Sequence, residues 1–389
     1  MRKRRTPSMM VRNLRNRRRK LLRLLFGVAA RVFGRSLPPP RRPGRIVVTR
    51  MQHLGDAAVF LPVLGALRDA FPQARIFTLC KHPAGYELLR RCPLLDGVLR
   101  VPRGSLLDKL RLWWWMWNNP VDLFVVSTQD LGRACWALVG GARCVVGYSR
   151  VPLYGSRQKE RCRFALTLDV GAARAEEREA ARNMRLAEAA ARRSVVPKRV
   201  EPRWWTPDEA ENAARLLGGT GFETGKYLIL GVGTKRPAKA WPSTRWSRLA
   251  GEVFRRRRMG CLVVGTRGES TAAREIVRDS SGVAASVAGK TGMGELLWLC
   301  AHAAGGVCVD SGVAHLIDAF DLPLVVLFGP GESAKWRPWG ARSTALVAAS
   351  PCAPCYNHLC PEGEPSPCMA AHEVEDVLDA LTGVMEATR

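Results

Sequence analysis

The chain has 389 residues, which is long enough for two domains with full-sized cores. Its hydrophobic content of 47% and charged content of 24% are ordinary for a globular protein and argue against a disordered or fibrous chain. The net charge of +27 is unusual, but residues 1–45 contain 16 Lys and Arg residues and no Asp or Glu. More than half of the excess charge therefore belongs to an N-terminal tail.

Within this tail, the apolar run Leu21–Ala30 follows the basic cluster Arg17–Lys20. The run is too short to span a bilayer and contains Arg23, and no convincing cleavage site follows it. We expect residues 1–44 to form a basic amphipathic tail with a Pro-rich linker that lies on an anionic inner leaflet. A solvated basic arm is the alternative, whereas nucleic-acid binding lacks any accompanying signature.

Short β-branched runs alternate with helical stretches from residue 45 onward. We expect strands at residues 46–50, 75–79, 97–101, 122–127 and 144–148. Helices are expected at residues 57–70, 85–91 and 133–139, in a segment that ends at residue 117, and at residues 171–195. Alternating elements of this kind build a parallel sheet that is covered on both faces.

A second alternating set begins at residue 226, after a linker that ends in a helix start near residues 204–209. Its expected strands are 227–232, 261–265, 284–288, 305–309 and 324–328, and its expected helices are 243–258, 269–279 and 293–303. The pattern predicts an α/β protein with two doubly wound, Rossmann-like domains that face each other across a cleft. We place the first domain at 45–200, the linker at 201–225 and the second domain at 226–389.

The segment from Asp310 to His315 lies between an apolar strand and a predicted helix, and a second apolar strand follows. This strand–turn–helix order places backbone N–H groups, the Ser311 hydroxyl and Gly312 at a helix N-terminus, where phosphate binds favourably. His315 is four residues from Ser311, so both lie on one face of the helix. The pattern predicts a site for a nucleotide or a sugar diphosphate.

The first predicted strand runs into a loop that contains Gly55 and Asp56, immediately before a helix. Reactive groups of such folds lie at the carboxyl ends of strands, so Asp56 is a candidate general base, and a helix N-cap is its structural alternative. Gly55 would allow close approach of a ligand. The loop matches neither the dinucleotide-binding fingerprint nor a Walker loop, which disfavours NAD binding and ATP hydrolysis.

Three further candidates follow the first two strands of the second set. The turn ending in Thr234 can expose backbone donors, and Lys239 can supply a point charge to a diphosphate. Glu269 follows the next strand and could accept ribose hydroxyls. Solvation of the lysine and a helix N-terminal charge are the structural alternatives.

The chain contains 12 cysteines, eight of which lie in apolar segments and read as buried residues of a reduced, cytosolic protein. The other four lie in a Pro-rich tail, at positions Cys352, Cys355, Cys360 and Cys368. Their spacing permits a structural tetrathiolate metal site, two disulfides, or four thiols that pack a small loop.

Taken together, these motifs resemble the ADP-heptose:lipopolysaccharide heptosyltransferase family, which comprises inverting glycosyltransferases of the two-domain GT-B arrangement. The similarity extends from about Arg45 to the C-terminus. It rests on the order and spacing of five motifs, Arg50-x4-Gly55-Asp56, Lys239-x-Trp241-Pro242, Gly265-x3-Glu269, Asp310-Ser311-Gly312-x2-His315 and Phe328-Gly329-Pro330. Val313, where many relatives have Pro, and His53 in the first loop depart from the pattern.

The resemblance implies that Asp56 activates an acceptor hydroxyl, which attacks the anomeric carbon of ADP-heptose. Lys239, Ser311, Gly312 and His315 would stabilise the departing diphosphate, Asp310 would shape the turn or contact the sugar, and Glu269 would bind the ribose. No cofactor would be required for catalysis, since lysine and helix amides neutralise the leaving group. An anionic glycolipid, the lipopolysaccharide inner core, would be the acceptor, and the enzyme would work on the inner face of the inner membrane.

Two alternatives remain open. One is a related GT-B transferase that uses another nucleotide sugar on a glycan or protein acceptor. The other is a non-catalytic protein of the same fold that binds a membrane surface.

Overall fold

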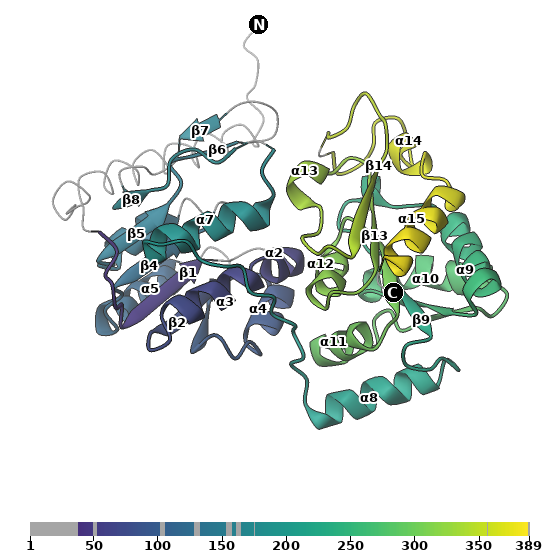
Figure 1. Ribbon diagram of the computed structural model, residues 1–389, viewed down its shortest axis with the longest axis horizontal. Helices are drawn as coiled ribbons and strands as arrows, with labels where there is room; N and C mark the ends of the chain where they lie inside the picture. Colours follow the sequence, from purple (N-terminus) through teal and green to yellow (C-terminus); the bar gives the residue numbers. More distant parts are fainter. Residues whose placement is uncertain are drawn as a thin grey trace, which may run out of the picture.

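The computed structural model describes residues 38–49, 53–101, 106–127, 133–152, 158–160, 165–174, 176–355 and 357–387. Two six-stranded parallel sheets, each covered by helices on both faces, lie side by side (Figure 1). This is the α/β architecture that the alternating pattern predicts. The predicted tail falls almost entirely outside the described residues, as does Cys162.

The N-terminal sheet has the strand order β3-β2-β1-β4-β5-β8. Its strands are β1 (Arg45–Thr49), β2 (Arg75–Cys80), β3 (Gly97–Arg100), β4 (Leu123–Val126), β5 (Cys144–Gly147) and β8 (Leu168–Asp169). Its helices are α2 (Leu54–Val59), α3 (Leu61–Ala70), α4 (Pro83–Leu89), α5 (Leu106–Asn118), α6 (Ala134–Val139) and α7 (Glu179–Ala191). A short antiparallel pair, β6 (Arg150–Pro152) and β7 (Gln158–Glu160), is attached to this half.

The C-terminal sheet has the same topology, β11-β10-β9-β12-β13-β14. Its strands are β9 (Tyr227–Gly231), β10 (Gly260–Val264), β11 (Ala284–Ser286), β12 (Gly305–Val309), β13 (Leu324–Phe328) and β14 (Ser343–Val347). Its α-helices are α8 (Pro207–Gly218), α9 (Ser243–Arg257), α10 (Ser270–Arg278), α11 (Met293–Ala301), α12 (Gly312–Ala319), α13 (Ser333–Trp336), α14 (Pro367–Ala370) and α15 (Val374–Glu386). Two short 3-10 turns, η3 (Pro237–Lys239) and η4 (Arg267–Glu269), follow β9 and β10.

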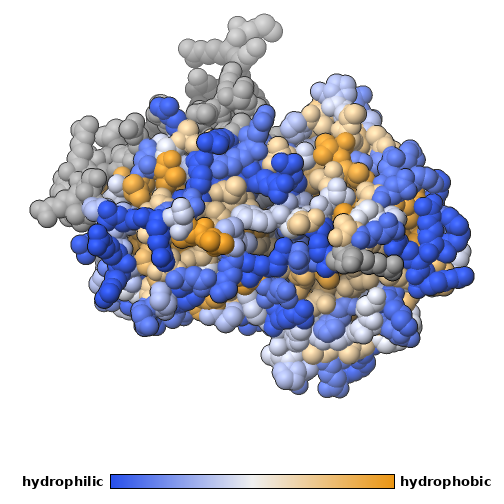
Figure 2. Space-filling model, in the orientation of Figure 1, coloured by the Kyte–Doolittle hydropathy of each residue, from blue (hydrophilic) through white to orange (hydrophobic). Residues whose placement is uncertain are grey.

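The central strands are buried along their whole length, which is why they read as continuous apolar runs. Buried apolar side chains form a cluster that includes residues of both halves, from Ile46 and Val48 to Leu316 and Phe328. Hydrophilic side chains cover most of the face seen in Figure 2, with apolar ones in small groups. No helix in the described residues is long and apolar enough to cross a membrane.

Three local expectations differ from the structure. The helix predicted at residues 57–70 is interrupted at Phe60, because Pro62 lies in the first turn of α3 and has no N–H to continue α2. Of residues 171–195, predicted as one helix, only Glu179–Ala191 is helical, as α7. The start of the segment is extended, because Ala172 pairs with Arg150 in an isolated β-bridge. Residues 201–225 are more than a linker, because helix α8 starts at the helix start predicted near residues 204–209, with N-cap Thr206 in a capping box with Glu209.

Candidate active site

Both sheets reverse their strand order at one point, between β1 and β4 in the first and between β9 and β12 in the second. Ligands of doubly wound folds bind beyond the carboxyl ends of the strands at such a point. The segments that follow β1, β9 and β12 carry Asp56 in the first turn of α2, Lys239 at the end of η3, and Asp310. The topology therefore brings the predicted site residues of each half to its switch point.

The helices α2 and α12 begin against each other at the junction of the two halves (Figure 1). Glycines make this approach possible. A Cβ atom on Gly55 would lie 2.9 Å from His315 Cδ2, and one on Gly312 would lie 3.0 Å from Leu54 Cβ. The loop of Asp56 and the predicted phosphate turn thus meet with almost no space between their backbones.

Asp56 is the third residue of α2, where its Oδ2 accepts the backbone N–H of His53 at 2.9 Å. Its carboxylate therefore supports the helix start, as the structural alternative expects, although it is not the N-cap itself. It is also close enough to His315 to favour the charged form of that imidazole electrostatically. Asp56 faces the second half of the molecule from the first.

Lys239 ends η3, and its Nζ bonds to the Asp310 carboxylate and to the Asp310 carbonyl oxygen at 3.3 Å. Both side chains are mostly buried, at 17% and 10% exposed. Thr234 stabilises the preceding turn, since its Oγ1 accepts the backbone N–H of Arg236 at 3.2 Å. Asp310 thus orients the one predicted cation of the diphosphate site.

Ser311 is the N-cap of α12, but its Oγ is buried and has no hydrogen-bond partner among the described residues. Buried hydroxyl groups are normally satisfied, so this one is available to a ligand. His315, one turn further along α12, is only 7% exposed. Burial lowers the pKa of its imidazole, although Asp310, Asp318 and Asp56 oppose the shift, so the site favours the neutral ring.

Glu269 ends η4, and its Oε2 accepts the backbone N–H of Thr266 at 2.7 Å. The same side chain lies over the turn that follows β9, with its Cδ 3.1 Å from the position of a Cβ on Gly233. Glu269 is therefore both a capping residue, as its structural alternative expects, and a neighbour of the Thr234 turn. The Glu269 side chain thus packs closely on the turn that carries Gly233, and the two loops form one surface.

The four C-terminal cysteines do not form a metal centre in the described part of the chain, where no group of three or more His, Cys, Asp or Glu side chains could hold an ion. All four are free thiols; Cys352 is exposed and Cys368 is buried. Cys368, in α14, packs against Gly329 at the end of β13, and the nearby thiols of Cys352 and Cys355 add to the burial that raises its pKa. The structure therefore supports neither the metal nor the disulfide alternative.

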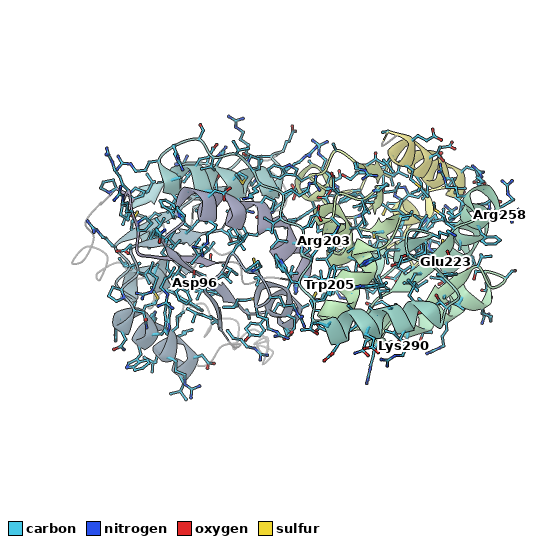
Figure 3. The ribbon with its side chains drawn as sticks, turned by 60° about the horizontal axis from the view of Figure 1, so that its bottom comes forward. Asp96, Arg203, Trp205, Glu223, Arg258 and Lys290 are labelled. Atoms are coloured by element: carbon cyan, nitrogen blue, oxygen red, sulfur yellow. The ribbon has the colours of Figure 1, made fainter. Side chains whose placement is uncertain are left out.

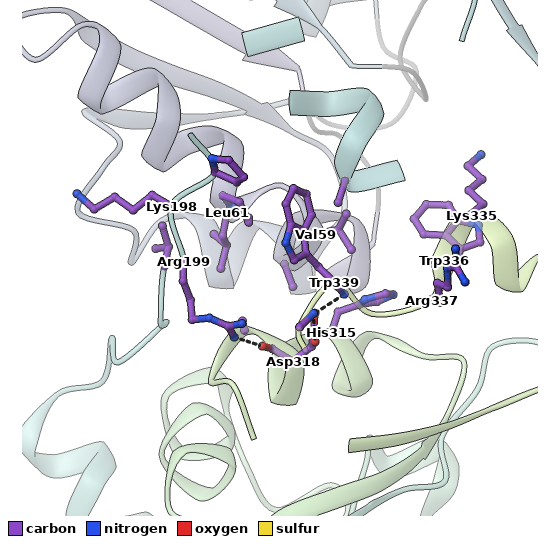
Figure 4. A pocket seen from close by; sticks show the side chains of 17 residues that line it. Val59, Leu61, Lys198, Arg199, His315, Asp318, Lys335, Trp336, Arg337 and Trp339 are labelled. Atoms are coloured by element: carbon purple, nitrogen blue, oxygen red, sulfur yellow. Dashed lines mark hydrogen bonds between the residues drawn. The ribbon is translucent and has the colours of Figure 1, made fainter. Parts of the chain in front are cut away.

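A pocket that is partly open to solvent lies between the two halves (Figure 4). Lys198 and Arg199, at the end of the N-terminal half, line part of it, and Asp318 of α12 lies beside them, where its carbonyl accepts Arg199 Nη1 at 2.8 Å. Of the predicted site residues, only His315 reaches it. Composition and spacing could not reveal this pocket, because its walls come from five separate stretches of chain.

Ion pairs between described residues join the halves near this junction, among them Arg199 with Asp321 at 2.8 Å. Arg91 of α4 makes a bidentate contact with Glu209 of α8 at 2.6 and 2.8 Å, which lowers the pKa of that carboxyl. Lys335 of α13 lies 3.8 Å from Glu179 of α7, and both are buried. The linker side chains Arg203 and Trp205 also lie at this junction (Figure 3).

A family model described as glycosyltransferase family 9 (heptosyltransferase) matches residues 139–365. Lipopolysaccharide heptosyltransferase 1 of Pseudomonas aeruginosa is 30% identical over 134 residues, which are 34% of this chain and 37% of that protein. Lipopolysaccharide heptosyltransferase 3 of Escherichia coli K12 is 23% identical over 300 residues, which are 74% of this chain and 83% of that protein. The chain thus aligns with little more than a third of the first relative and most of the second.

Among solved structures, E. coli heptosyltransferase WaaC with ADP superposes with a TM-score of 0.66 at 15% identity. The superposition covers 87% of this chain and 99% of that one. At this identity the likeness shows the fold, which is the GT-B arrangement of two facing Rossmann-like halves.

Proposed function

Because the chain belongs to glycosyltransferase family 9, the heptosyltransferases, and is therefore a glycosyltransferase, we propose that it transfers heptose from ADP-heptose to a lipopolysaccharide inner-core acceptor. One observation carries the proposal. The loop of Asp56 and the turn Asp310–Gly312, which come from different halves, abut through Gly55 and Gly312. The proposed base and the proposed diphosphate site are thereby neighbours, so that a donor sugar bound at their edge can place its anomeric carbon between them, as single displacement requires.

The diphosphate end of the donor is assigned to the N-terminus of α12. The backbone N–H groups there, the Ser311 hydroxyl and Lys239 offer donors of both neutral and charged kinds. Asp310 holds the ammonium group in place, so little reorganisation is needed when negative charge develops on the leaving group. Burial favours the neutral form of His315, which contributes a hydrogen bond rather than a charge. The adenosine ribose is assigned to Glu269.

In the proposed reaction Asp56 takes the proton of the acceptor hydroxyl. The hydroxyl oxygen forms a bond to the anomeric carbon, while the bond from that carbon to the β-phosphate oxygen breaks and ADP leaves. Attack from the face opposite the diphosphate inverts the configuration. In this scheme no metal is required, because Lys239 and the helix amides stabilise the departing charge.

We also assign the enzyme to the cytoplasmic face of the inner membrane. The exposed apolar side chains Leu107, Leu110, Trp114 and Trp117 follow one face of α5, and the two tryptophans are 66% and 62% exposed. Interfacial tryptophans beside basic segments are typical of surfaces that lie on anionic lipid. The opposite face of α5 packs into the core through Leu112 and Met116, which fixes the exposed face toward solvent.

Ligand-induced stabilisation tests the donor. We expect ADP and ADP-heptose, at one hundred times their dissociation constants, to raise the free energy of unfolding by about 2.7 kcal/mol, and NADH to have no effect. Lys239→Met should remove much of this stabilisation. Lys226→Met is the matched control, since Lys226 precedes β9, at the opposite end of the strand from the site, and is exposed.

Three outcomes are informative. Selective protection by ADP ligands, followed by mass-spectrometric detection of heptose on a core acceptor, supports the proposal. A preference for UDP or GDP ligands would keep the fold and reject the donor. Stabilisation by none of these nucleotides would favour the non-catalytic alternative.

A further inference from the structure

Three basic side chains from separate parts of the sequence meet at the mouth of the site. Lys235, which follows β9, has its Nζ 2.8 Å from His53 Nδ1 and 2.9 Å from His82 Nε2. The two imidazole rings lie edge to face, with centroids 4.2 Å apart. His53 and His82 belong to the N-terminal half and Lys235 to the C-terminal half, so the cluster spans the junction.

The cluster lies beside the proposed general base. The backbone N–H of His53 donates to Asp56, so this imidazole extends from the turn that holds the carboxylate. His82 follows β2, the neighbour of β1 in the sheet. An acceptor whose hydroxyl reaches Asp56 therefore brings its adjacent substituents close to these rings.

The cluster is distinct from the cation assigned to the donor. Lys239 is mostly buried and bonded to Asp310, whereas Lys235 and His53 are exposed and His82 is half-buried. Lys81 and Arg236, the sequence neighbours of His82 and Lys235, add to the local positive charge. A ring nitrogen that accepts from an ammonium group can donate to an anion once the ring is protonated, so the three side chains can together surround a carboxylate or phosphate.

We propose that His53, His82 and Lys235 form the subsite for an anionic substituent, a carboxylate or phosphate, that the acceptor carries next to its reactive hydroxyl. Two of the three side chains belong to the half that holds Asp56, which favours the acceptor over the donor diphosphate as the source of the anion. The proposal rests on the proposed function, because it takes Asp56 as the base. It makes these residues determinants of acceptor specificity rather than of the chemical step.

The test compares two acceptors, one with its acidic group intact and one with that group removed or esterified. In His53→Gln, His82→Gln and Lys235→Met, we expect kcat/KM for the charged acceptor to fall about tenfold to a hundredfold, mainly through KM, as the loss of a charge-assisted hydrogen bond implies. The neutral acceptor and the KM for ADP-heptose should change less than about threefold. Lys226→Met is again the matched control.

Equal losses on both acceptors would overturn the proposal and make the cluster a structural contact between the halves. A rise confined to the KM for ADP-heptose would assign the anion to the donor. A binding measurement separates the proposal from the reaction: with ADP present, the imidazole NMR signals of His53 and His82 should shift with the charged acceptor alone. If wild-type protein shows these shifts but transfers no heptose, the proposed function fails and the subsite stands; if neither signal moves, the subsite is rejected.

Discussion

The carboxylate of Asp56 accepts the backbone N–H of His53 in the structure and, in the proposed reaction, the proton of the acceptor. The two roles are compatible, because a carboxylate has two oxygens and several lone pairs. The capping contact orients the side chain before substrate binds. At the scale of single residues, the site is thus assembled by contacts that also stabilise its loops, as with Asp310 and Lys239.

Asp56→Asn should preserve the shape of the side chain and its capping oxygen while removing the base. We expect kcat to fall by about a hundredfold to ten-thousandfold, with stabilisation by ADP unchanged. Steady-state kinetics measure the change in kcat, and thermal unfolding with ADP measures the stabilisation by the nucleotide. The matched control is Asp69→Asn, whose carboxylate is exposed and pairs with Lys198 on the outside of the molecule. Full activity in Asp56→Asn would remove this residue from the mechanism.

At the scale of elements, the contact between α2 and α12 determines whether base and phosphate site are correctly spaced. Gly55 and Gly312 have ordinary backbone dihedral angles, so these positions require glycine only because a Cβ atom would meet the facing helix. Glycine is needed at both positions so that the starts of α2 and α12 can pack closely, and not because the backbone adopts a conformation that other residues avoid.

Gly55→Ala and Gly312→Ala should therefore push the two helix starts apart. We expect each to lower the free energy of unfolding by about 1–3 kcal/mol and kcat/KM by about a hundredfold. Gly251→Ala in α9 is the control, since nothing lies within 4 Å of its Cβ position, and it should stabilise the fold by up to about 1 kcal/mol. Chemical denaturation and kinetics measure both effects. Wild-type kinetics in both site variants would show that the spacing of the two helices is not needed for transfer.

At the scale of the whole molecule, charge and apolar surface are arranged unevenly. The basic tail precedes the N-terminal half, and the exposed stripe of α5 belongs to the same half. The C-terminal half carries the proposed donor site. This division is consistent with an enzyme that holds a glycolipid acceptor near a membrane and receives a water-soluble donor from the other side.

Membrane binding should therefore have two separable contributions. Replacing Arg17–Lys20 with glutamines should weaken sedimentation with anionic vesicles most strongly at low salt, since each cation near the surface is worth about 1 kcal/mol. Replacing Trp114 and Trp117 with serine should weaken it at high salt as well, because burial of apolar surface is not screened. Phe254→Ser, at an exposed position on α9, is the control. Binding that is unchanged in both variants would reject the surface assignment.

The local pattern of apolar and polar residues predicted most strands of this protein. The strands β12 and β13 have the predicted bounds, because a strand buried on both faces gives an uninterrupted apolar run that ends where the loop begins. The same pattern predicts that four site residues lie just beyond the carboxyl ends of strands: Asp56, Lys239, Glu269 and Asp310. The order of strands and loops along the chain is enough for this prediction. The short edge strand β8 has too few residues to show an alternation or a run of apolar side chains, so the sequence did not predict it.

Only the tertiary structure decided which of these loops meet. The pairing of Lys239 with Asp310 joins residues 71 positions apart, and the contact of Lys235 with His53 joins residues 182 apart. Such contacts depend on how the two sheets pack, and neither residue of a pair carries a local signal of its partner. The sequence could therefore name the groups that perform the chemistry, whereas the approach of α2 to α12 and the clustering of His53, His82 and Lys235 follow from packing between halves that are distant in the chain.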